Sequence, residues 1–259
     1  MEKGRLIGVG NTAEVYEYDE NKVIKLFYEG YPKESVKKEF QNASIIKECS
    51  FLKPKVHTLE TIDNRNGIVY DKVAGESLYD ELMRTGDINN CGKVLSKVHS
   101  EMLNSPGTGL DSFHDIISNA ITWNLELSNS RKTKLFHLLE NLPEKNTICH
   151  GDFHPGNILL QENRAYIIDF MNLCYGNPYM DIARTVYLIE MTPIPEAIQD
   201  KEQFLELKKE VASIYLGYLG IERQELNEYL ILVSVRRLNE GVSVNEKKMI
   251  LKFLESFNI

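Results

Sequence analysis

The chain has 259 residues, of which 42% are apolar and 26% are charged, and its formal net charge is -8. This length allows one large domain or two small ones with a substantial core, and the composition excludes a disordered, collagen-like or coiled-coil chain. The longest nearly apolar run, Tyr229 to Val235, is far shorter than the ~20 residues that a membrane-spanning helix needs. The first residues, from Met1 to Leu6, contain no apolar stretch of signal-peptide length. We therefore expect a cytoplasmic protein with no membrane partner.

The charges and the cysteines narrow the possible partners further. No cluster of lysine and arginine is dense enough to follow a phosphate backbone, so we expect no nucleic-acid partner. The acidic excess fits a cationic small molecule better than an anionic one, although surface carboxylates also serve solubility. No CxxC pair occurs, which predicts reduced and mostly buried thiols rather than disulfides or a zinc site at the four cysteines, Cys49, Cys91, Cys149 and Cys174.

The first 72 residues are predicted to be rich in β-structure, with one helix. Alternating, β-branched and aromatic residues predict a series of short strands at 5–8, 14–18, 22–28, 55–59 and 67–71. Between the third and fourth strands, Pro32 is a plausible helix start. After it, apolar residues recur every three or four positions, at Val36, Phe40, Ala43 and Ile46.

From residue 73 onward the pattern is helical almost to the end. Apolar stripes at helical spacing occur within 91–102, 135–142, 204–214, 226–233 and 250–257. One β island interrupts them, with strands at 158–160 and 165–168. We therefore predict an α+β protein with two lobes. The N-terminal lobe would cover residues 1–72 and the helical C-terminal lobe residues 73–259, with a hinge near 72–75.

The most specific motif is His150-Gly-Asp-Phe-His-Pro-Gly-Asn157, followed by Asp169 at the end of a short apolar strand. Phosphoryl transfer from a nucleotide needs one carboxylate near the substrate hydroxyl, here Asp152. It also needs oxygen ligands for Mg²⁺, here Asn157 and Asp169. Alternatively, these residues only form a polar turn of a hairpin. That interpretation is weaker, because an unpartnered charge at Asp169 beside apolar strand residues would be costly.

A metal-dependent hydrolase is a second functional interpretation of the same segment. His150, Asp152 and His154 are spaced by two residues, which places three metal-ligating side chains on one face of a strand. Such a site would need further ligands, and the other histidines lie in unrelated contexts. Pro155 and Gly156 also break a strand. We therefore favour the phosphotransferase interpretation.

Two glycines near the N-terminus, Gly8 and Gly10, form part of a candidate nucleotide loop. A dinucleotide or P-loop site needs a helix directly after the glycines, whereas here a strand follows. The glycines are therefore expected in a β-hairpin that lies over phosphates as a backbone lid. Lys25, in an apolar strand, is either a solvated surface lysine or a phosphate ligand. Glu39 lies on the side of the following helix that can face the sheet, so it is the candidate partner of Lys25.

Together these segments resemble the superfamily of kinase-like small-molecule phosphotransferases, which includes aminoglycoside phosphotransferases, choline kinases and homoserine-type kinases. The resemblance rests on Val23-Ile-Lys25, the 150–157 motif, Ile168-Asp-Phe170 and Gly176-Asn-Pro-Tyr-Met-Asp-Ile-Ala183, and it covers essentially the full length. It implies a two-lobed protein-kinase-like fold. Protein kinases have arginine where this chain has Gly151 and need an activation segment. Only eleven residues separate Asp169 from Asp181, which favours a small-molecule substrate.

The resemblance also implies roles for individual residues. Asp152 would be the catalytic base, Asn157 and Asp169 the Mg²⁺ ligands, and Asp181 a brace for the catalytic loop. The predicted nucleotide-binding residues are Gly8, Gly10, Lys25, Glu39 and the backbone of Asp71 and Val73. The phosphate donor would be ATP or GTP. Two positions depart from the family pattern, Ala13 in the glycine loop and Met171 after Asp169-Phe.

The predicted function is an ATP- or GTP-dependent, Mg²⁺-requiring kinase that phosphorylates a hydroxyl of a small molecule, and the predicted state is a monomer. An aminoglycoside is the first acceptor expected, and an amino alcohol, an amino acid or a sugar is the alternative. A different class remains open, a non-catalytic kinase-like binding protein of the spore-coat type. The presence of Lys25, Asp152, Asn157 and Asp169 weighs against it, because a binding protein has no chemical need for all four.

Overall fold

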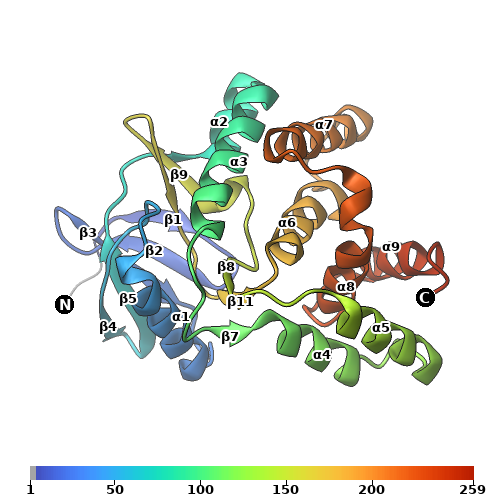
Figure 1. Ribbon diagram of the computed structural model, residues 1–259. Helices are drawn as coiled ribbons and strands as arrows, with labels where there is room; N and C mark the ends of the chain where they lie inside the picture. The colour runs from blue at the N-terminus through green and yellow to red at the C-terminus, as the bar shows by residue number, and fades with distance from the viewer. Residues whose placement is uncertain (1–3) are drawn as a thin grey trace. The chain divides into compact units, whose positions relative to one another are not determined.

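The computed structural model describes residues 4–259, so Met1, Glu2 and Lys3, which contributed to the signal-peptide argument, lie outside the described residues. The chain divides into two compact units. The first contains residues 1–81 and 156–173, and the second contains residues 82–155 and 174–259. The predicted α+β class is confirmed, because a β-rich N-terminal sheet is followed by a mainly helical region (Figure 1).

The main sheet of the first unit has five antiparallel strands in the order β1-β2-β3-β5-β4. Their bounds are β1 Leu6–Val9, β2 Ala13–Glu17, β3 Lys22–Phe27, β4 Val56–Ile62 and β5 Arg65–Asp71. The alternation in β3 and β5 directs Ile24, Leu26 and Val69 into a core that also contains Ile62. This pattern leaves Lys25 on the opposite face of β3, where it can take part in a polar site.

Helix α1 (Lys33–Ile45) packs against β4 and β5 and is followed by the short 3-10 helix η1 (Ile46–Glu48) (Figure 1). The helix begins directly after Pro32, whose fixed backbone angle suits this position. Val36, Ala43 and Ile46 are buried, as their spacing predicts. Glu39 is also fully buried, so the apolar face of this helix carries one carboxylate into the interior.

A second, three-stranded sheet of the first unit has the order β10-β9-β6. Strands β9 (Ile158–Gln161) and β10 (Arg164–Ile167) form the hairpin predicted from the sequence, and β6 is only Glu76–Ser77. Because β6 pairs with β9, residues beyond the predicted hinge, up to Glu81, belong to the first unit together with 156–173. The chain passes between the units three times, within helix α2 (Leu78–Thr85), at the start of the 3-10 helix η2 (Pro155–Asn157) and between Leu173 and Cys174.

The second unit consists mainly of helices. It contains α3 Ile88–Leu103, α4 Phe113–Trp123, α5 Asn129–Asn141, α6 Pro178–Val186, α7 Lys201–Leu219, α8 Asn227–Leu238 and α9 Val244–Glu255. Shorter helical segments are the π-helix η3 (Tyr187–Met191) and the 3-10 helix η4 (Arg223–Leu226). A small sheet, in the order β7-β11-β8, joins Asp111–Ser112, Cys174–Gly176 and Thr147–Cys149. This sheet fixes the chain at the start of the 150–157 motif, because β8 ends directly before His150.

Helices α3 and α7 pack closely because Gly92 lies at their contact. A Cβ atom at Gly92 would lie 2.5 Å from Cγ2 and 2.9 Å from Cβ of Ile214, and 3.1 Å from the backbone nitrogen of Tyr215. These distances are too short for van der Waals contact, and the backbone atom cannot rotate away. The glycine therefore sets the separation of the two helices.

Replacing Gly92 by alanine is expected to destabilise the protein. Glycine to alanine inside a helix normally stabilises by ~0.5–1 kcal/mol, but overpacking costs ~1–3 kcal/mol, so a net loss of about 1 kcal/mol is expected. Gly217→Ala in α7 is the matched control, because nothing lies within 4 Å of the place that its new Cβ atom would take, and it should stabilise the protein. Urea unfolding of both variants tests this. Equal or opposite effects would contradict the close packing at Gly92.

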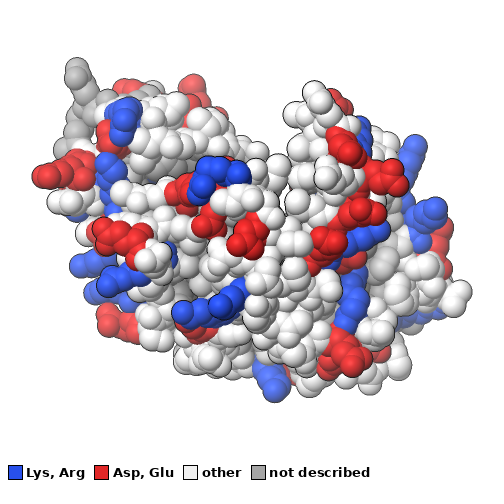
Figure 2. Space-filling view, turned by 90° about the horizontal axis from the view of Figure 1, so that it is seen from above, with Lys and Arg blue, Asp and Glu red and all other residues white. Residues whose placement is uncertain are grey.

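The burial of the cysteines and the charges on the surface agree with what the composition predicts. Cys91, Cys149 and Cys174 are buried free thiols and Cys49 is partly exposed, so the cysteines are mostly buried, as predicted. Acidic and basic side chains are interspersed on the face in Figure 2. Within residues 4–259, none of the helices has both the length and the apolar character that a bilayer crossing requires.

Candidate active site

Lys25 and Glu39 form the centre of the polar site in the first unit. Lys25 Nζ donates to both carboxylate oxygens of Glu39, at 2.9 Å each, and Tyr70 donates its hydroxyl to Glu39 Oε1 at 3.0 Å. The sequence argument named Glu39 as the partner of Lys25, and the pair is present. Glu34, another glutamate of this helix, is 81% exposed and pairs with Lys37. A lysine held in this way is not a solvated surface residue.

Asp169 is the second carboxylate of this group. Its Oδ1 accepts from Lys25 Nζ at 2.9 Å, so the ammonium lies between two carboxylates. Burial alone would lower the pKa of Lys25, but the charges of Glu39 and Asp169 outweigh it and hold the pKa above its ordinary value. Lys25 therefore stays positively charged at physiological pH. A permanent positive charge is what a ligand of nucleotide phosphates needs.

The backbone at Asp169 is held in an unusual conformation, with a φ of 67°. Left-handed backbone is uncommon for residues other than glycine, and it persists only where the surroundings fix it. Hydrogen bonds fix the backbone both before and after Asp169. The N–H of Ile167 donates to the carbonyl of Leu52, and Asn42 Nδ2 donates to the carbonyl of Phe170 at 2.9 Å. The chain reversal thus aims the Asp169 carboxylate toward Lys25.

Asn157 lies at the same end of the β9–β10 hairpin as Asp169. It directly precedes β9, its carbonyl accepts from the N–H of Ile168, and Asp169 follows. An amide oxygen and a carboxylate are hard oxygen donors of the kind that Mg²⁺ prefers. Mg²⁺ usually takes only one or two protein carboxylates together with substrate phosphates, so this donor set fits that ion.

The remaining predicted nucleotide residues lie in the main sheet or directly beside it. Gly8 is in β1 and Gly10 is in the turn to β2, so the glycines lie in a β-hairpin with no helix directly after them, as predicted. Asp71 ends β5, and its N–H donates to the carbonyl of Lys55. That N–H is therefore not the group that would contact a base. Val73 follows two residues later, just before β6.

Residues 150–155 of the candidate motif belong to the second unit, where α6 holds the backbone of His150 and Gly151. Asn177 caps this helix through the N–H of Tyr179, and Pro178 occupies the first turn. Asp181 in the same turn accepts from the N–H of His150 at 2.6 Å and of Gly151 at 2.8 Å. The predicted bracing role of Asp181 is confirmed.

A buried chain of side chains keeps Asp181 in place. His99 Nε2 lies 3.0 Å from Asp181 Oδ2, and the other ring nitrogen lies 2.6 Å from the hydroxyl of Tyr215. Burial lowers the pKa of His99, so the ring is neutral. Burial also raises the pKa of Tyr215, so its hydroxyl is the donor to Nδ1 and Nε2–H donates to Asp181. Burial would raise the pKa of Asp181, but the hydrogen bonds it accepts from His99 and Gly151 hold it below its ordinary value.

Asp152 is fixed between two anchored neighbours. Gly151 has a φ of 74°, which glycine adopts without strain, and its N–H is held by Asp181. Phe153 is fully buried and its ring stacks on His99, with centroids 3.9 Å apart. The Asp152 side chain between them is 29% exposed. A carboxylate on a rigid backbone and in contact with solvent is suited to meet a substrate hydroxyl.

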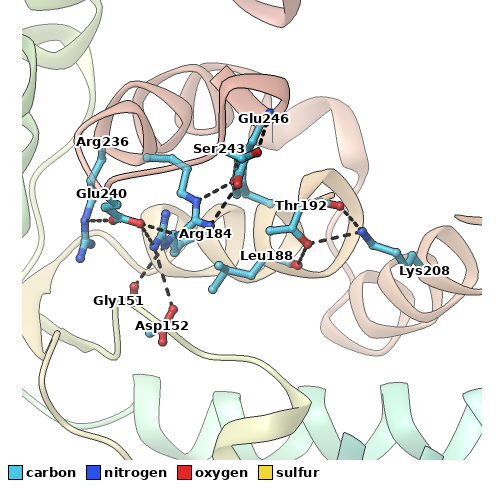
Figure 3. A network of polar contacts seen from close by, with 12 residues as sticks. Gly151, Asp152, Arg184, Leu188, Thr192, Lys208, Arg236, Glu240, Ser243 and Glu246 are labelled. Atoms are coloured by element: carbon cyan, nitrogen blue, oxygen red, sulfur yellow. Dashed lines mark hydrogen bonds and ion pairs between the residues drawn. The ribbon is translucent and has the colours of Figure 1, made fainter. Parts of the chain in front are cut away.

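Sequence reasoning missed Arg184, which lies three residues after Asp181 and therefore on the same side of α6. Its Nε donates to the carbonyl of Gly151 at 3.2 Å, and its Nη2 lies 2.6 Å from Glu240 (Figure 3). Asp181 and Arg184 together therefore hold both the N–H and the carbonyl of Gly151. Glu240, which directly follows Asn239 beyond the end of α8, is thus an ion-pair partner of Arg184.

The metal-hydrolase interpretation finds no support. His154 Nε2 lies 3.9 Å from Asp152, and His150 is fully buried in the loop. Across residues 4–259, no group of three or more histidine, cysteine, aspartate or glutamate side chains is arranged to hold a metal ion. The motif therefore lacks the ligand set that a zinc-type hydrolase needs.

The family is established by comparison with known proteins. The chain matches the model of the phosphotransferase enzyme family over residues 3–214, and it belongs to that family. This match covers Lys25, Asp152 and Asp169, and it also covers helix α6. A search of the curated proteins gave no match.

Solved structures confirm the kinase-like fold. An apo thermostable mutant of aminoglycoside phosphotransferase APH(4)-Ia matches with a TM-score of 0.67 at 13% identity, covering 98% of this chain and 94% of that chain. Amicoumacin kinase hAmiN matches with a TM-score of 0.60 at 16% identity, covering 98% and 87%. A choline/ethanolamine kinase family protein from Mesorhizobium loti matches with a TM-score of 0.57 at 15% identity, covering 100% and 87%. At identities this low, the comparisons establish a shared fold alone.

Proposed function

We propose that this protein is a Mg²⁺-dependent small-molecule kinase that transfers the γ-phosphoryl group of ATP or GTP to a hydroxyl. The observation that supports this most strongly is the Lys25 ammonium held 2.9 Å from both Glu39 and Asp169. Burying such charges is costly, and a protein that only binds a partner gains nothing from it. This argues against the non-catalytic alternative of the spore-coat type.

The proposed nucleotide site uses the N-terminal lobe, residues 1–72, and the start of the following segment. Lys25 meets the α- and β-phosphates while Glu39 orients it, and the backbone at Gly8 and Gly10 covers the phosphates. The backbone of Asp71 and Val73 holds the purine. Asn157 and Asp169 would hold Mg²⁺, which neutralises charge on the phosphate oxygens when bound.

In the proposed chemical step, the Asp152 carboxylate accepts the proton of the acceptor hydroxyl. The acceptor oxygen forms a bond to the γ-phosphorus, and the bond between that phosphorus and the β,γ-bridging oxygen breaks. Asp181 and Arg184 hold the loop backbone, so the Asp152 carboxylate keeps its position during the transfer. Acceptor recognition is assigned to the helical region, residues 73–259.

The acceptor we propose to test first is an aminoglycoside. The net charge of -8 favours a cationic molecule, and solved structures of this fold include an aminoglycoside phosphotransferase in a ternary complex with AMP-PNP and hygromycin B. An amino alcohol is the second class, since a choline/ethanolamine kinase family protein shares the fold. We further propose that the protein acts as a cytoplasmic monomer.

Nucleotide binding is expected to stabilise the protein only when a divalent ion is present. At 100 times the dissociation constant, ATP with Mg²⁺ should stabilise the folded state by ~2.7 kcal/mol. Lys25→Met is the control variant, because it removes the proposed phosphate ligand, and it should show a much smaller shift. Thermal unfolding of both proteins with ATP, with GTP and with each nucleotide after EDTA treatment measures this. The absence of any shift with both nucleotides would refute the proposal.

The acceptor is then identified by direct phosphorylation. Aminoglycosides, choline, homoserine and amino sugars are incubated with the enzyme and the preferred nucleotide, and products are detected by a mass increase of one phosphoryl group. If the negative charge attracts a cationic acceptor, its KM should rise with salt, because exposed charges are screened beyond ~8 Å at physiological ionic strength. A flat response or a neutral acceptor would refute the cationic class and leave the kinase proposal intact.

A further inference from the structure

Arg184 lies between two carboxylates of the second unit. It is 2% exposed, its Nη2 lies 2.6 Å from Glu240 Oε2, and the same nitrogen lies 4.0 Å from Asp152 Oδ1 (Figure 3). The contact with Glu240 is a hydrogen-bonded ion pair, whereas the contact with Asp152 is an ion pair at a distance longer than a hydrogen bond. Arg184 is thus hydrogen-bonded to Glu240, and it would need to move about one ångström closer to Asp152 to form a hydrogen bond there.

The guanidinium of Arg184 has donor capacity left. Its Nε donates to the Gly151 carbonyl at 3.2 Å, and Nη1 is buried without a hydrogen-bond partner among the described residues. A buried donor without an acceptor is unfavourable, so this side chain would gain from another carboxylate. The nearest second carboxylate is Asp152, and a guanidinium binds a carboxylate most strongly through two parallel N–H groups.

Glu240 is held as a fixed anion by several arginines. Besides Arg184, Arg236 Nε lies 3.2 Å and Arg237 Nη1 lies 3.0 Å from its oxygens. Burial would raise the pKa of Glu240, but the charges of Arg184 and Arg236 outweigh it and the pKa lies below its ordinary value. Arg237 is fixed in turn by Glu246, at 2.7 Å. Glu240 therefore offers Arg184 a permanent, rigid partner.

We propose that Glu240 is a positioning residue that holds Arg184 back from Asp152. A hydrogen-bonded pair would let Arg184 take up lone pairs of the Asp152 carboxylate and further stabilise its negative charge, which makes the carboxylate a weaker proton acceptor. Held by Glu240, Arg184 fixes the loop through the Gly151 carbonyl and keeps only a long ion-pair contact with the Asp152 side chain, without a hydrogen bond to it. This inference rests on the proposed role of Asp152 as the catalytic base.

The first test is Glu240→Gln, which keeps the shape of the side chain and removes its charge. With its anionic partner lost, Arg184 should move onto Asp152. We expect kcat to fall by about tenfold or more, within the usual contribution of a general base, while the nucleotide KM stays within about twofold. A crystal structure of the variant should show a hydrogen bond between Arg184 and Asp152.

The matched control is Glu246→Gln. This change weakens the same polar network one step further from Asp152, because Glu246 binds Arg237 and Tyr187. It should lower the thermal stability about as much as Glu240→Gln but leave kcat nearly unchanged. If both variants lose the same activity, the effect is a general weakening of the fold and the proposal is wrong.

The decisive arm is the double variant Arg184→Gln with Glu240→Gln. A glutamine side-chain nitrogen occupies the same place along the chain as arginine Nε, so it can still donate to the Gly151 carbonyl. The double variant should have the kcat of Arg184→Gln alone and exceed Glu240→Gln, because no guanidinium remains to bind Asp152. Multiplicative losses in the double variant, or Arg184 still 4.0 Å from Asp152 in the Glu240→Gln crystal, would overturn the proposal.

The role of Asp152 is separated from this inference by Asp152→Asn. If that variant keeps its turnover, the proposed function fails, whatever Glu240 does. If it loses turnover while Glu240→Gln behaves like Glu246→Gln, only the role assigned to Glu240 fails.

Discussion

Asp152→Asn is expected to abolish phosphoryl transfer and leave nucleotide binding nearly intact. Asparagine keeps the shape of the side chain but cannot accept the hydroxyl proton, and general-base contributions are ~10²–10⁴-fold. The loop should not move, since Gly151 is held by Asp181 and Arg184, and Phe153 stacks on His99. Calorimetric titration with ATP and Mg²⁺, beside steady-state turnover of the best acceptor, measures the two quantities separately.

Asp115→Asn controls for the loss of one surface charge. Asp115 lies in the first turn of α4 with its side chain 77% exposed, so its variant should keep wild-type turnover. If Asp152→Asn retained more than about a third of the wild-type turnover, Asp152 would not be the base, because a general base contributes far more than that. A variant that lost turnover and ATP affinity together would instead indicate a disturbed nucleotide site.

The parts of the site that the sequence predicts are those built from local patterns. The strand carrying Lys25 and the hairpin before Asp169 are runs of β-branched and apolar residues, whose two-residue period determines which face each side chain takes. The helical period after Pro32 places Glu39 on the buried face of α1. Two independent local periods therefore suffice to bring Lys25 and Glu39 together.

The boundary between the units depends on contacts that no local pattern encodes. Strand β6 has two residues, too few for a period, yet its pairing with β9 joins segments far apart in the chain. The strands of the β7-β11-β8 sheet have two or three residues each. Such strands form because longer neighbouring elements bring their backbones into register. Their existence therefore follows from packing and not from propensity.

The contacts of Arg184 could not be predicted from the sequence for the same reason. Helical spacing shows that Asp181 and Arg184 share one side of α6. The partner, Glu240, follows the end of α8, and its approach depends on how α6 and α8 pack. Sequence alone therefore indicates that Arg184 can face the catalytic loop, but not that an anion competes for it.

Asp169→Ala is expected to remove productive Mg²⁺–nucleotide binding, because the ion would lose its anionic protein ligand. The half-saturating Mg²⁺ concentration for activity should rise by about tenfold or more, which corresponds to ~1.4 kcal/mol or more. Titrating Mg²⁺ against activity at fixed nucleotide measures this. Glu39 still holds Lys25 in the variant, so the loss should lie in the metal requirement and not in the position of the lysine.

Alanine at position 169 also tests the backbone, because the left-handed φ of 67° is unfavourable for it. Asp169→Asn separates the two effects. Asparagine tolerates this conformation and keeps one oxygen donor, so the variant should fold like the wild type and still need more Mg²⁺. A raised requirement in both variants supports the ligand role, since the asparagine variant loses the charge and one oxygen donor but keeps the backbone conformation. An unchanged requirement in Asp169→Asn would reject that role and leave Asp169 as a structural partner of Lys25.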